Sequence, residues 1–463
     1  MYIFKYLLVV SLALVFIACS SKEDSVKLEK KELHVETDKK VDKVDKVCLD
    51  VKKVQIYDLE NTPQDIREFT KNLDDVTSFY EIQKRYEKYY FRVWNFQKPN
   101  ETVEDIKWPF KSYKVGDSYG ENLQLLDEDF FTSMYKNANF DKYLSVSKKA
   151  ITLKHLNIRG FPTLRPLLRD PLLAGEGFPF DYLQNSTISA NKPIFVSHFS
   201  KDGEWAYIFS SFTSGWVKST DIVFMQKRYT DQWQKAQQVF ITKENIPIHD
   251  TNDKFLFSSK IGMMLPLIEE EKDAYVVLVI SKYKNSEPLY ARAKISKSIS
   301  HKGILALSKD NLNHIISEVS TSNYGWGGMY GQRDCSSTLR DIFSPFGIWL
   351  PRNSSQQAKI GKVISLKDLN DDEKIKLIKE KAIPFQTLLY KRGHIVLYVG
   401  TYDNEIIILH NTWGIKTKKD DIYGRIIIGK TILSTLEVGK YQKNYDANSS
   451  ILRNLKSLNI LTE

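Results

Sequence analysis

One cysteine and two histidines in the last third of the chain are of the residue types that nucleophilic catalysis requires. Cys335 lies in a glycine-rich stretch, 323–337, directly before a segment with helical spacing, 336–343. Unpaired N–H groups at a helix N-terminus stabilise a thiolate, so this position favours a reactive nucleophile. A buried structural cysteine behind a glycine-rich turn is the alternative that this segment alone leaves open.

The two histidines are predicted to lie on neighbouring strands. His394 begins one predicted strand and His410 ends the next. In a hairpin centred near Tyr402, the two positions lie directly opposite each other, within reach of a hydrogen bond. A thiol nucleophile needs a base, and the base needs a third group that fixes its tautomer and orientation. Two unrelated histidines at strand ends are the alternative.

The elements around these residues predict an α+β domain over 301–440, in which a helix carrying the cysteine packs on an antiparallel sheet. A C-terminal tail, 441–463, is expected to follow it. Helical spacing covers 308–318, 336–343 and 374–381. Strands are expected at 387–390, 394–399, 405–410 and 425–428, with turns at 391–393, 401–404 and 413–414.

The preceding part of the chain divides into a helical region and two β-rich regions. Residues 57–149 carry aromatic side chains at helical spacing and predict a helical N-terminal clip. In the absence of clustered carboxylates, these aromatics indicate core packing rather than a carbohydrate platform. Residues 150–227 and 228–300 alternate short strands with turns, and the Gly215-Trp-Val strand resembles that of bacterial SH3-like barrels. Such barrels bind wall peptides, support a catalytic domain or act as spacers.

The N-terminus predicts export. Residues 1–19 contain an apolar run that is too short for a comfortable membrane span, and its ending, Phe16-Ile-Ala-Cys19, resembles the bacterial lipobox. Lipidation of Cys19 is therefore expected; an ordinary signal peptide with an incidental cysteine is the alternative. Residues 20–56 are dense in charged side chains and predict a solvated tether. Cys48, within the tether, has no assigned role.

Composition and cysteine count exclude several classes of partner and cofactor. The chain has 463 residues, 42% of them hydrophobic, which is enough for several cores. Its net charge of +10 is spread along the chain without an Arg-rich block, so no nucleic-acid partner is expected. No His-Glu-x-x-His or Cys-x-x-Cys pattern occurs, so no metal or other cofactor is expected. With Cys19 lipidated, no disulfide framework remains, and Cys335 is expected to be a free thiol.

Four motifs together resemble the NlpC-type, papain-like peptidases of bacterial cell walls, in the variant with a helical N-terminal clip and two SH3-like domains. The motifs are Tyr324-Gly-Trp-Gly-Gly328, Asp334-Cys-Ser336, Gly393-His-Ile-Val-Leu-Tyr-Val-Gly400 and Leu409-His410. The family's usual Phe or Gly before Asp-Cys is replaced by Arg333. That residue places a positive charge beside the thiol, where it either favours the thiolate or reshapes the substrate pocket.

The resemblance implies a role for each site residue. Cys335 corresponds to the nucleophile, His394 to the general base and acid, and His410 to the orienting third residue. Tyr324 corresponds to a residue near the oxyanion. Asp334 and Ser336 match positions that, in some relatives, hold the free amine of a short peptide stem.

The implied activity is a cell-wall cysteine endopeptidase that hydrolyses an amide bond in peptidoglycan stem peptides through an acyl-thioester. The bond expected from the family joins γ-D-glutamate to a diamino acid. The expected location is the cell envelope, with a lipid anchor in the periplasm, and Ser20 favours the outer over the inner membrane. A wall-binding lipoprotein with an inert peptidase domain is one alternative. Amidase or acyltransferase chemistry with the same triad is the other.

Overall fold

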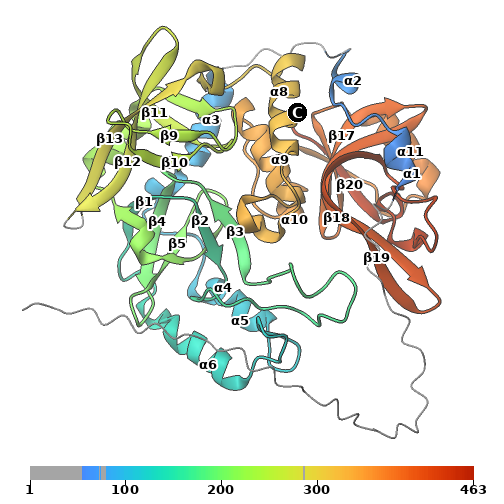
Figure 1. Ribbon diagram of the computed structural model, residues 1–463, viewed down its shortest axis with the longest axis horizontal. Helices are drawn as coiled ribbons and strands as arrows, with labels where there is room; N and C mark the ends of the chain where they lie inside the picture. The colour runs from blue at the N-terminus through green and yellow to red at the C-terminus, as the bar shows by residue number, and fades with distance from the viewer. Residues whose placement is uncertain (1–54, 72, 74–79, 285–286, 463) are drawn as a thin grey trace, which may run out of the picture. The chain divides into compact units, whose positions relative to one another are not determined.

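The structure, a computed structural model, describes residues 55–71, 73, 80–284 and 287–462 (Figure 1). The predicted signal peptide with Cys19 lies outside the described residues, as does almost all of the predicted tether with Cys48. The chain from Val54 onward forms one compact unit. Within the described part of the chain, no helix is both long enough and apolar enough to cross a membrane.

The predicted fold class is confirmed: a helical N-terminal region precedes two small β-rich domains and an α+β domain. Side chains cap two helices of the N-terminal region; at one of them, the Thr102 and Asp105 side chains each accept from the other residue's backbone N–H. Trp94 is fully buried and donates to the carbonyl of Ala150, which ties this region to the first strand. The helices are α1 (Tyr57–Asn61), α2 (Arg67–Thr70), α3 (Tyr80–Tyr90), α4 (Val103–Ile106), α5 (Trp108–Ser112) and α6 (Glu128–Asn137).

The first β-rich domain is an antiparallel sheet with the order β3-β2-β6-β5-β4-β1-β7. Strands β4 and β5 form a hairpin that pairs Phe199 with Ala206 and Phe195 with Phe209. A long loop, 160–183, connects β2 to β3. The strands are β1 (Lys148–Thr152), β2 (Leu156–Arg159), β3 (Gln184–Ile188), β4 (Pro193–Phe199), β5 (Trp205–Phe209), β6 (Ser214–Lys218) and β7 (Ile222–Phe224).

The second β-rich domain opens with a helix and continues as a sheet with the order β13-β12-β11-β8-β14, beside a two-stranded pair, β9 and β10. Strand β8 is buried throughout, whereas the last five residues of β13 alternate between exposed and buried side chains. The elements are α7 (Lys227–Lys235), β8 (Gln238–Ile241), β9 (Pro247–His249), β10 (Phe255–Ser258), β11 (Met264–Glu270), β12 (Ala274–Lys284), β13 (Glu287–Ser296) and β14 (Ser300–Lys302).

The α+β domain contains an antiparallel sheet with the order β15-β20-β16-β17-β18-β19, drawn in orange to red in Figure 1. Its helices are α8 (Lys309–Ser320), α9 (Cys335–Phe343), α10 (Ser354–Gln357), α11 (Asp371–Lys381) and α12 (Ile451–Asn454). Its strands are β15 (Lys362–Ser365), β16 (Thr387–Lys391), β17 (His394–Tyr402), β18 (Glu405–Lys419), β19 (Ile422–Thr435) and β20 (Leu455–Ile460).

Two predicted features of this domain are wrong. The segment 441–463 is not a tail, because β20 lies inside the sheet and pairs with both β15 and β16. The predicted turn at 413–414 is instead a register shift within β18, between Thr412 and Gly414. A side chain at Gly414 would lie 2.1 Å from the carbonyl oxygen of Ile426, so glycine marks a close strand approach there rather than a turn.

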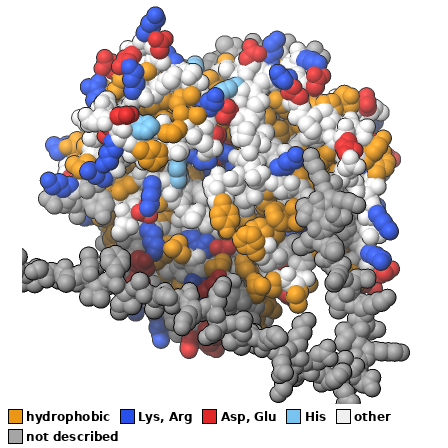
Figure 2. Space-filling model, in the orientation of Figure 1, with side chains coloured by type: hydrophobic (Ala, Val, Ile, Leu, Met, Phe, Trp, Pro, Cys, Tyr) orange, Lys and Arg blue, Asp and Glu red, His pale blue; other side chains and the backbone are white. Residues whose placement is uncertain are grey.

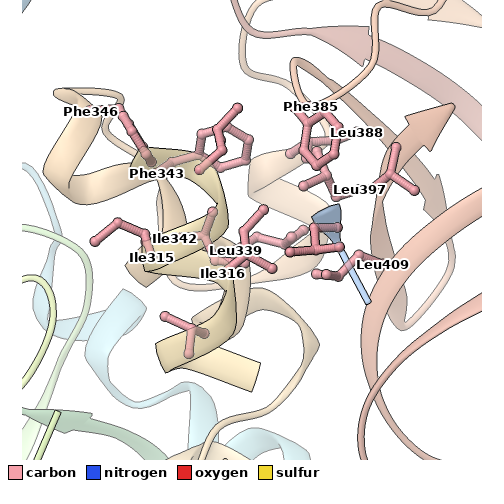
Figure 3. Close-up of a cluster of buried hydrophobic side chains, with 14 of the residues drawn as sticks. Ile315, Ile316, Leu339, Ile342, Phe343, Phe346, Phe385, Leu388, Leu397 and Leu409 are labelled. Atoms are coloured by element: carbon pink, nitrogen blue, oxygen red, sulfur yellow. The ribbon is translucent and has the colours of Figure 1, made fainter. Parts of the chain in front are cut away.

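The core beneath the cysteine-bearing helix is apolar. Figure 3 shows Leu339 and Ile342 of α9 between Ile315 and Ile316 of α8 and the sheet residues Leu397 and Leu409. These side chains are almost completely buried. Because α9 buries its apolar side in this core, its first turn is held against the strands that carry the histidines.

Leu339→Ala is expected to lower the free energy of unfolding by about 2–5 kcal/mol, since it removes a fully buried side chain and leaves a cavity. Urea denaturation measures the change. Leu172→Ala is the matched control, because Leu172 is 92% exposed, and its effect is expected to stay within about 0.5 kcal/mol. Equal effects of the two substitutions would contradict this description of the core.

Candidate active site

The first turn of α9 holds Cys335. Asp334 caps the helix by accepting from the N–H of Ser337 at 2.9 Å, and the Ser337 hydroxyl accepts from the N–H of Asp334 at 2.9 Å. The cap fixes the direction of the helix start, so the thiol at the first helical position has a defined orientation. Cys335 is half-buried and has no disulfide partner among the described residues.

The glycine-rich stretch allows the loop before α9 to approach the first β-rich domain. Gly327 and Gly328 have φ values of 60° and 83°. A side chain at Gly327 would lie 2.2 Å from the carbonyl oxygen of Gln184 in β3. Both positions therefore require glycine. The same loop carries Tyr324, whose N–H donates to the carbonyl of Gly429 at 2.8 Å and so joins the loop to β19.

The predicted contact between the histidines is confirmed. His394 Nε2 lies 2.8 Å from His410 Nδ1, and His410 Nε2 lies 3.0 Å from the Ser434 hydroxyl. That hydroxyl donates to the carbonyl of Thr435, so its lone pairs accept from His410 Nε2–H. His410 Nδ1 then accepts from His394 Nε2–H, which leaves the lone pair of His394 on Nδ1. Ser434, which the sequence analysis missed, thereby sets the tautomer of both imidazoles.

The predicted register of this hairpin is wrong by about two residues. Asp403 and Asn404 both have positive φ, 47° and 66°, and form a two-residue turn that pairs Tyr402 with Glu405. A register shift follows between Tyr398 and Gly400. The two imidazoles therefore meet diagonally across the strands rather than directly opposite each other.

Burial dominates the electrostatics of the reactive groups. Burial, and then the negative charge of Asp334, raise the pKa of Cys335 to about 12. Backbone N–H groups of Ile395 and Ser336 oppose this rise, as the helix N-terminus predicts, but do not overcome it. Burial, and then repulsion from Lys391, lower the pKa of His394 to about 3. The resting pair is thus a thiol and a neutral imidazole.

Asp334 and Ser336 are engaged by a residue that the sequence analysis missed. Arg352 Nη2 lies 2.5 Å from Asp334 Oδ2, and its Nη1 donates to Ser336 Oγ at 2.9 Å. Burial raises the pKa of the Asp334 carboxyl, but the charge and hydrogen bonds of Arg352 and the bonds from Ser337 outweigh it and lower the pKa below its ordinary value. Nothing local to Arg352 in the sequence points to this contact.

Arg333 does not place its charge beside the thiol. Its guanidinium lies 2.7 Å from Glu244 of the second β-rich domain and 2.8 Å from Asp341 on α9. Its Nη1 also donates to the Ser322 hydroxyl at 2.7 Å. Arg333 therefore connects α9 to the second β-rich domain, and the cation whose charge lowers the pKa of Cys335 is Arg352.

The reactive residues line one cleft of about 580 Å³. Cys335, His394, His410 and Tyr324 all face it. One wall comes from the long loop of the first β-rich domain, which contributes Glu176, Phe180 and Tyr182. Phe180 packs edge-on against Trp326 and Trp413, at ring distances of 5.3 and 5.4 Å. Among the described residues, no group of three or more His, Cys, Asp or Glu side chains is placed to hold a metal ion.

Four family models match successive parts of the chain. The N-terminal NLPC_P60 stabilising domain matches residues 8–143. An SH3 domain of the SH3b1 type matches residues 166–218, and one of the SH3b2 type matches residues 226–272. The NlpC/P60 family itself matches residues 321–432, which include Tyr324, Cys335, His394 and His410.

One solved structure agrees with these matches over most of the chain. An NlpC/P60 endopeptidase from Photobacterium damselae subsp. piscicida aligns with 87% of this chain and 98% of its own, at 26% identity and a TM-score of 0.76. An NlpC/P60 family protein from Bacillus cereus ATCC 10987 aligns with 60% of this chain and 82% of its own, at 14% identity and a TM-score of 0.43. No curated protein matches the sequence. The chain thus carries an NlpC/P60 catalytic domain over residues 321–432, preceded by a region that matches the N-terminal stabilising domain and by two SH3 domains.

Proposed function

We propose that the protein is a cysteine endopeptidase that hydrolyses an amide bond in peptidoglycan stem peptides. The observation that carries the proposal is a single cleft in which the Cys335 thiol faces the hydrogen-bonded pair His394 and His410. A thiol, a base with a free nitrogen lone pair and a group that orients the base are the parts that acyl transfer to a thiol requires.

The proposed reaction assigns one step to each of these groups. His394 Nδ1 accepts the proton of the Cys335 thiol as Sγ attacks the carbonyl carbon. The Cys335 N–H and the Tyr324 hydroxyl, which makes no hydrogen bond with a described residue, stabilise the negative oxygen that forms. His394 then gives the proton to the leaving amine as the C–N bond breaks. Water, deprotonated by His394, attacks the thioester carbon, and the carboxylic acid and the thiol are released.

The bond that we propose joins γ-D-glutamate to a diamino acid. Stem peptides with this linkage carry free carboxylates. Lys391, Lys416 and Arg425 line the cleft, whereas Glu176 is the single acidic side chain among the described lining residues, so the cleft attracts anions. We also propose that a substrate amine reaches Asp334. Among the described residues, only Arg352 donates to Asp334 Oδ2, so one lone pair of this oxygen is left to accept from the amine.

Mass spectrometry of a muropeptide digest tests this function. The expected result is a hydrolysed stem whose two products differ from the substrate by one water. Intact stems of every length, together with retained binding to the wall, would instead support an inert domain. Products extended by an added amine would support transfer, and loss of the whole stem from the glycan would support an amidase.

We further propose that Cys19 is lipidated and anchors the protein in the periplasm, on the outer rather than the inner membrane. Acyl chains on one cysteine give stable anchoring, because each buried CH₂ contributes about 0.8 kcal/mol. Wild-type protein is expected in the membrane fraction of the cells, and Cys19→Ala in the soluble fraction. Density-gradient separation distinguishes the two membranes. An unchanged membrane fraction for Cys19→Ala would contradict the anchor.

His410→Ala is expected to lower kcat by about 10²–10⁴-fold, with a much smaller change in KM, because His410 orients the base rather than the substrate. His410→Asn is the matched variant, since its amide oxygen can still accept from His394 Nε2–H, and it is expected to recover part of kcat. Steady-state kinetics on a defined stem peptide measure both. A change confined to KM would contradict the orienting role.

A further inference from the structure

A second pocket, here called the rear pocket, lies on the opposite side of α9 from the catalytic cleft. It has a volume of about 320 Å³. Cys335 faces the cleft, whereas Arg340 and Asp341, more than one helical turn further along α9, face the rear pocket. The remaining walls come from the N-terminal helical region, from both SH3 domains and from residues 330–333 and 348–350 of the catalytic domain. No residue with a role in the proposed hydrolysis lines it.

Lys192 reaches into the rear pocket without a partner of opposite charge. It is only 6% exposed, and its amine makes no hydrogen bond or ion pair with a described residue. Its contacts are the faces of aromatic rings, with Nζ 3.3 Å from the ring centre of Tyr90 and 6.0 Å from that of Phe212. A buried amine that lacks a hydrogen-bond acceptor is rare in a folded protein. Burial also lowers the pKa of Lys192 well below its ordinary value.

Arg340 supplies a second unsatisfied donor beside the same ring. Its guanidinium carbon lies 4.2 Å from the ring centre of Phe212. Its Nε and Nη2 share Asp341 Oδ1, but Nη1 is buried and has no hydrogen-bond partner among the described residues. Two cations thus lie within about 6 Å of the Phe212 ring, each with a donor that the described residues leave unused.

The carboxylates near the rear pocket are already committed to other cations. Asp341 pairs with Arg333 as well as Arg340, and Glu244 pairs with Arg333 and Lys260. Lys192 is the remaining lining cation, and it has neither carboxylate as a partner. His155 does not change this balance, because burial lowers its pKa and keeps its imidazole neutral. The described lining is thus cationic on balance.

We propose that the rear pocket binds a small organic carboxylate whose charged group meets Lys192 and Arg340 while its flat or apolar body lies against Phe212 and Trp349. Charge-assisted hydrogen bonds satisfy the unused donors, and the aromatic walls exclude water from the body of the ligand. Because Arg340 belongs to α9, the ligand contacts the helix that carries the nucleophile. The site is separate from the catalytic cleft and goes beyond the proposed hydrolysis.

Benzoate is the probe, and benzamide, which has nearly the same shape without the charge, is its control. Benzoate titrated into the full-length protein at constant ionic strength is expected to raise Tm and to give a saturable signal in calorimetry, whereas benzamide is not. Lys192→Met keeps the volume of the side chain and removes the charge. It is expected to weaken benzoate binding at least about tenfold. Lys201→Met, at an exposed site of the same SH3 domain, is expected to bind as the wild type does.

The catalytic cleft is also basic, so a second variant identifies where benzoate binds. Lys416→Met removes a cation from the cleft and is expected to leave benzoate binding unchanged. Loss of binding in Lys416→Met with retention in Lys192→Met would place the anion in the cleft and overturn the proposal. Equal binding of benzoate and benzamide, or no binding by the wild type, would overturn it as well. None of these readouts depends on hydrolysis.

Discussion

Replacement of Cys335 by alanine is expected to lower stem-peptide hydrolysis by at least about 10⁴-fold, because no thioester can form without the thiol. The rest of the cleft remains in place, so binding of the uncleaved stem is expected to persist. Mass spectrometry of digests measures the rate, and calorimetry with the intact stem measures the binding. Loss of both together would indicate a damaged fold rather than a missing nucleophile.

The fold of this variant is expected to be close to that of the wild type. Cys335 is only half-buried, and alanine keeps the backbone of α9 and its Asp334 cap. Cys48→Ala is the matched control, since it removes a thiol from the predicted tether and is expected to retain full activity. If Cys335→Ala still cleaved stems while Cys48→Ala did not, the assignment of the nucleophile would be wrong.

Local sequence patterns were sufficient for the parts of the site that one or two neighbouring elements determine. Helical spacing after Cys335 predicts α9, and alternation around Tyr402 predicts the hairpin of β17 and β18. The contact between His394 and His410 follows from that hairpin. The register differs because it depends on the turn conformation at 403–404 and on a bulge, which hydrophobic alternation does not reveal.

Features that depend on distant partners could not be predicted in this way. Strand β20 enters the sheet by pairing with β15 and β16, which precede it by many residues, so its own sequence does not reveal its neighbours. The role of Arg352 becomes evident only in the folded chain, where its guanidinium donates to Asp334 and to Ser186 of the first SH3 domain. Arg333 similarly finds Glu244 in the second SH3 domain. A hydrogen bond from the first SH3 domain and an ion pair from the second thus connect these domains to residues next to the catalytic helix.

Arg352→Met is expected to lower the free energy of unfolding at neutral pH by about 3–5 kcal/mol, the usual range when one partner of a buried ion pair is removed. Arg352 is 3% exposed and Asp334 is 9% exposed, so the substitution leaves the Asp334 carboxylate buried without its main cation. Arg165→Met is the matched control, because Arg165 forms an exposed ion pair with Glu121 and is expected to change stability by less than about 1 kcal/mol. Urea denaturation measures both.

The pH dependence of this loss has a defined sign. In the wild type the Asp334 pKa lies below its ordinary value of 3.8, so its stabilising contribution is present above that pH and is lost as the pH falls through the folded pKa. In Arg352→Met, burial without the cation raises the Asp334 pKa above the unfolded value, so the carboxylate destabilises the fold at neutral pH. Protonation relieves that penalty in acid. The difference between the two proteins is therefore expected to shrink as the pH falls towards about 4, and a difference that stays constant with pH would show that the loss comes from packing rather than from the charge of Asp334.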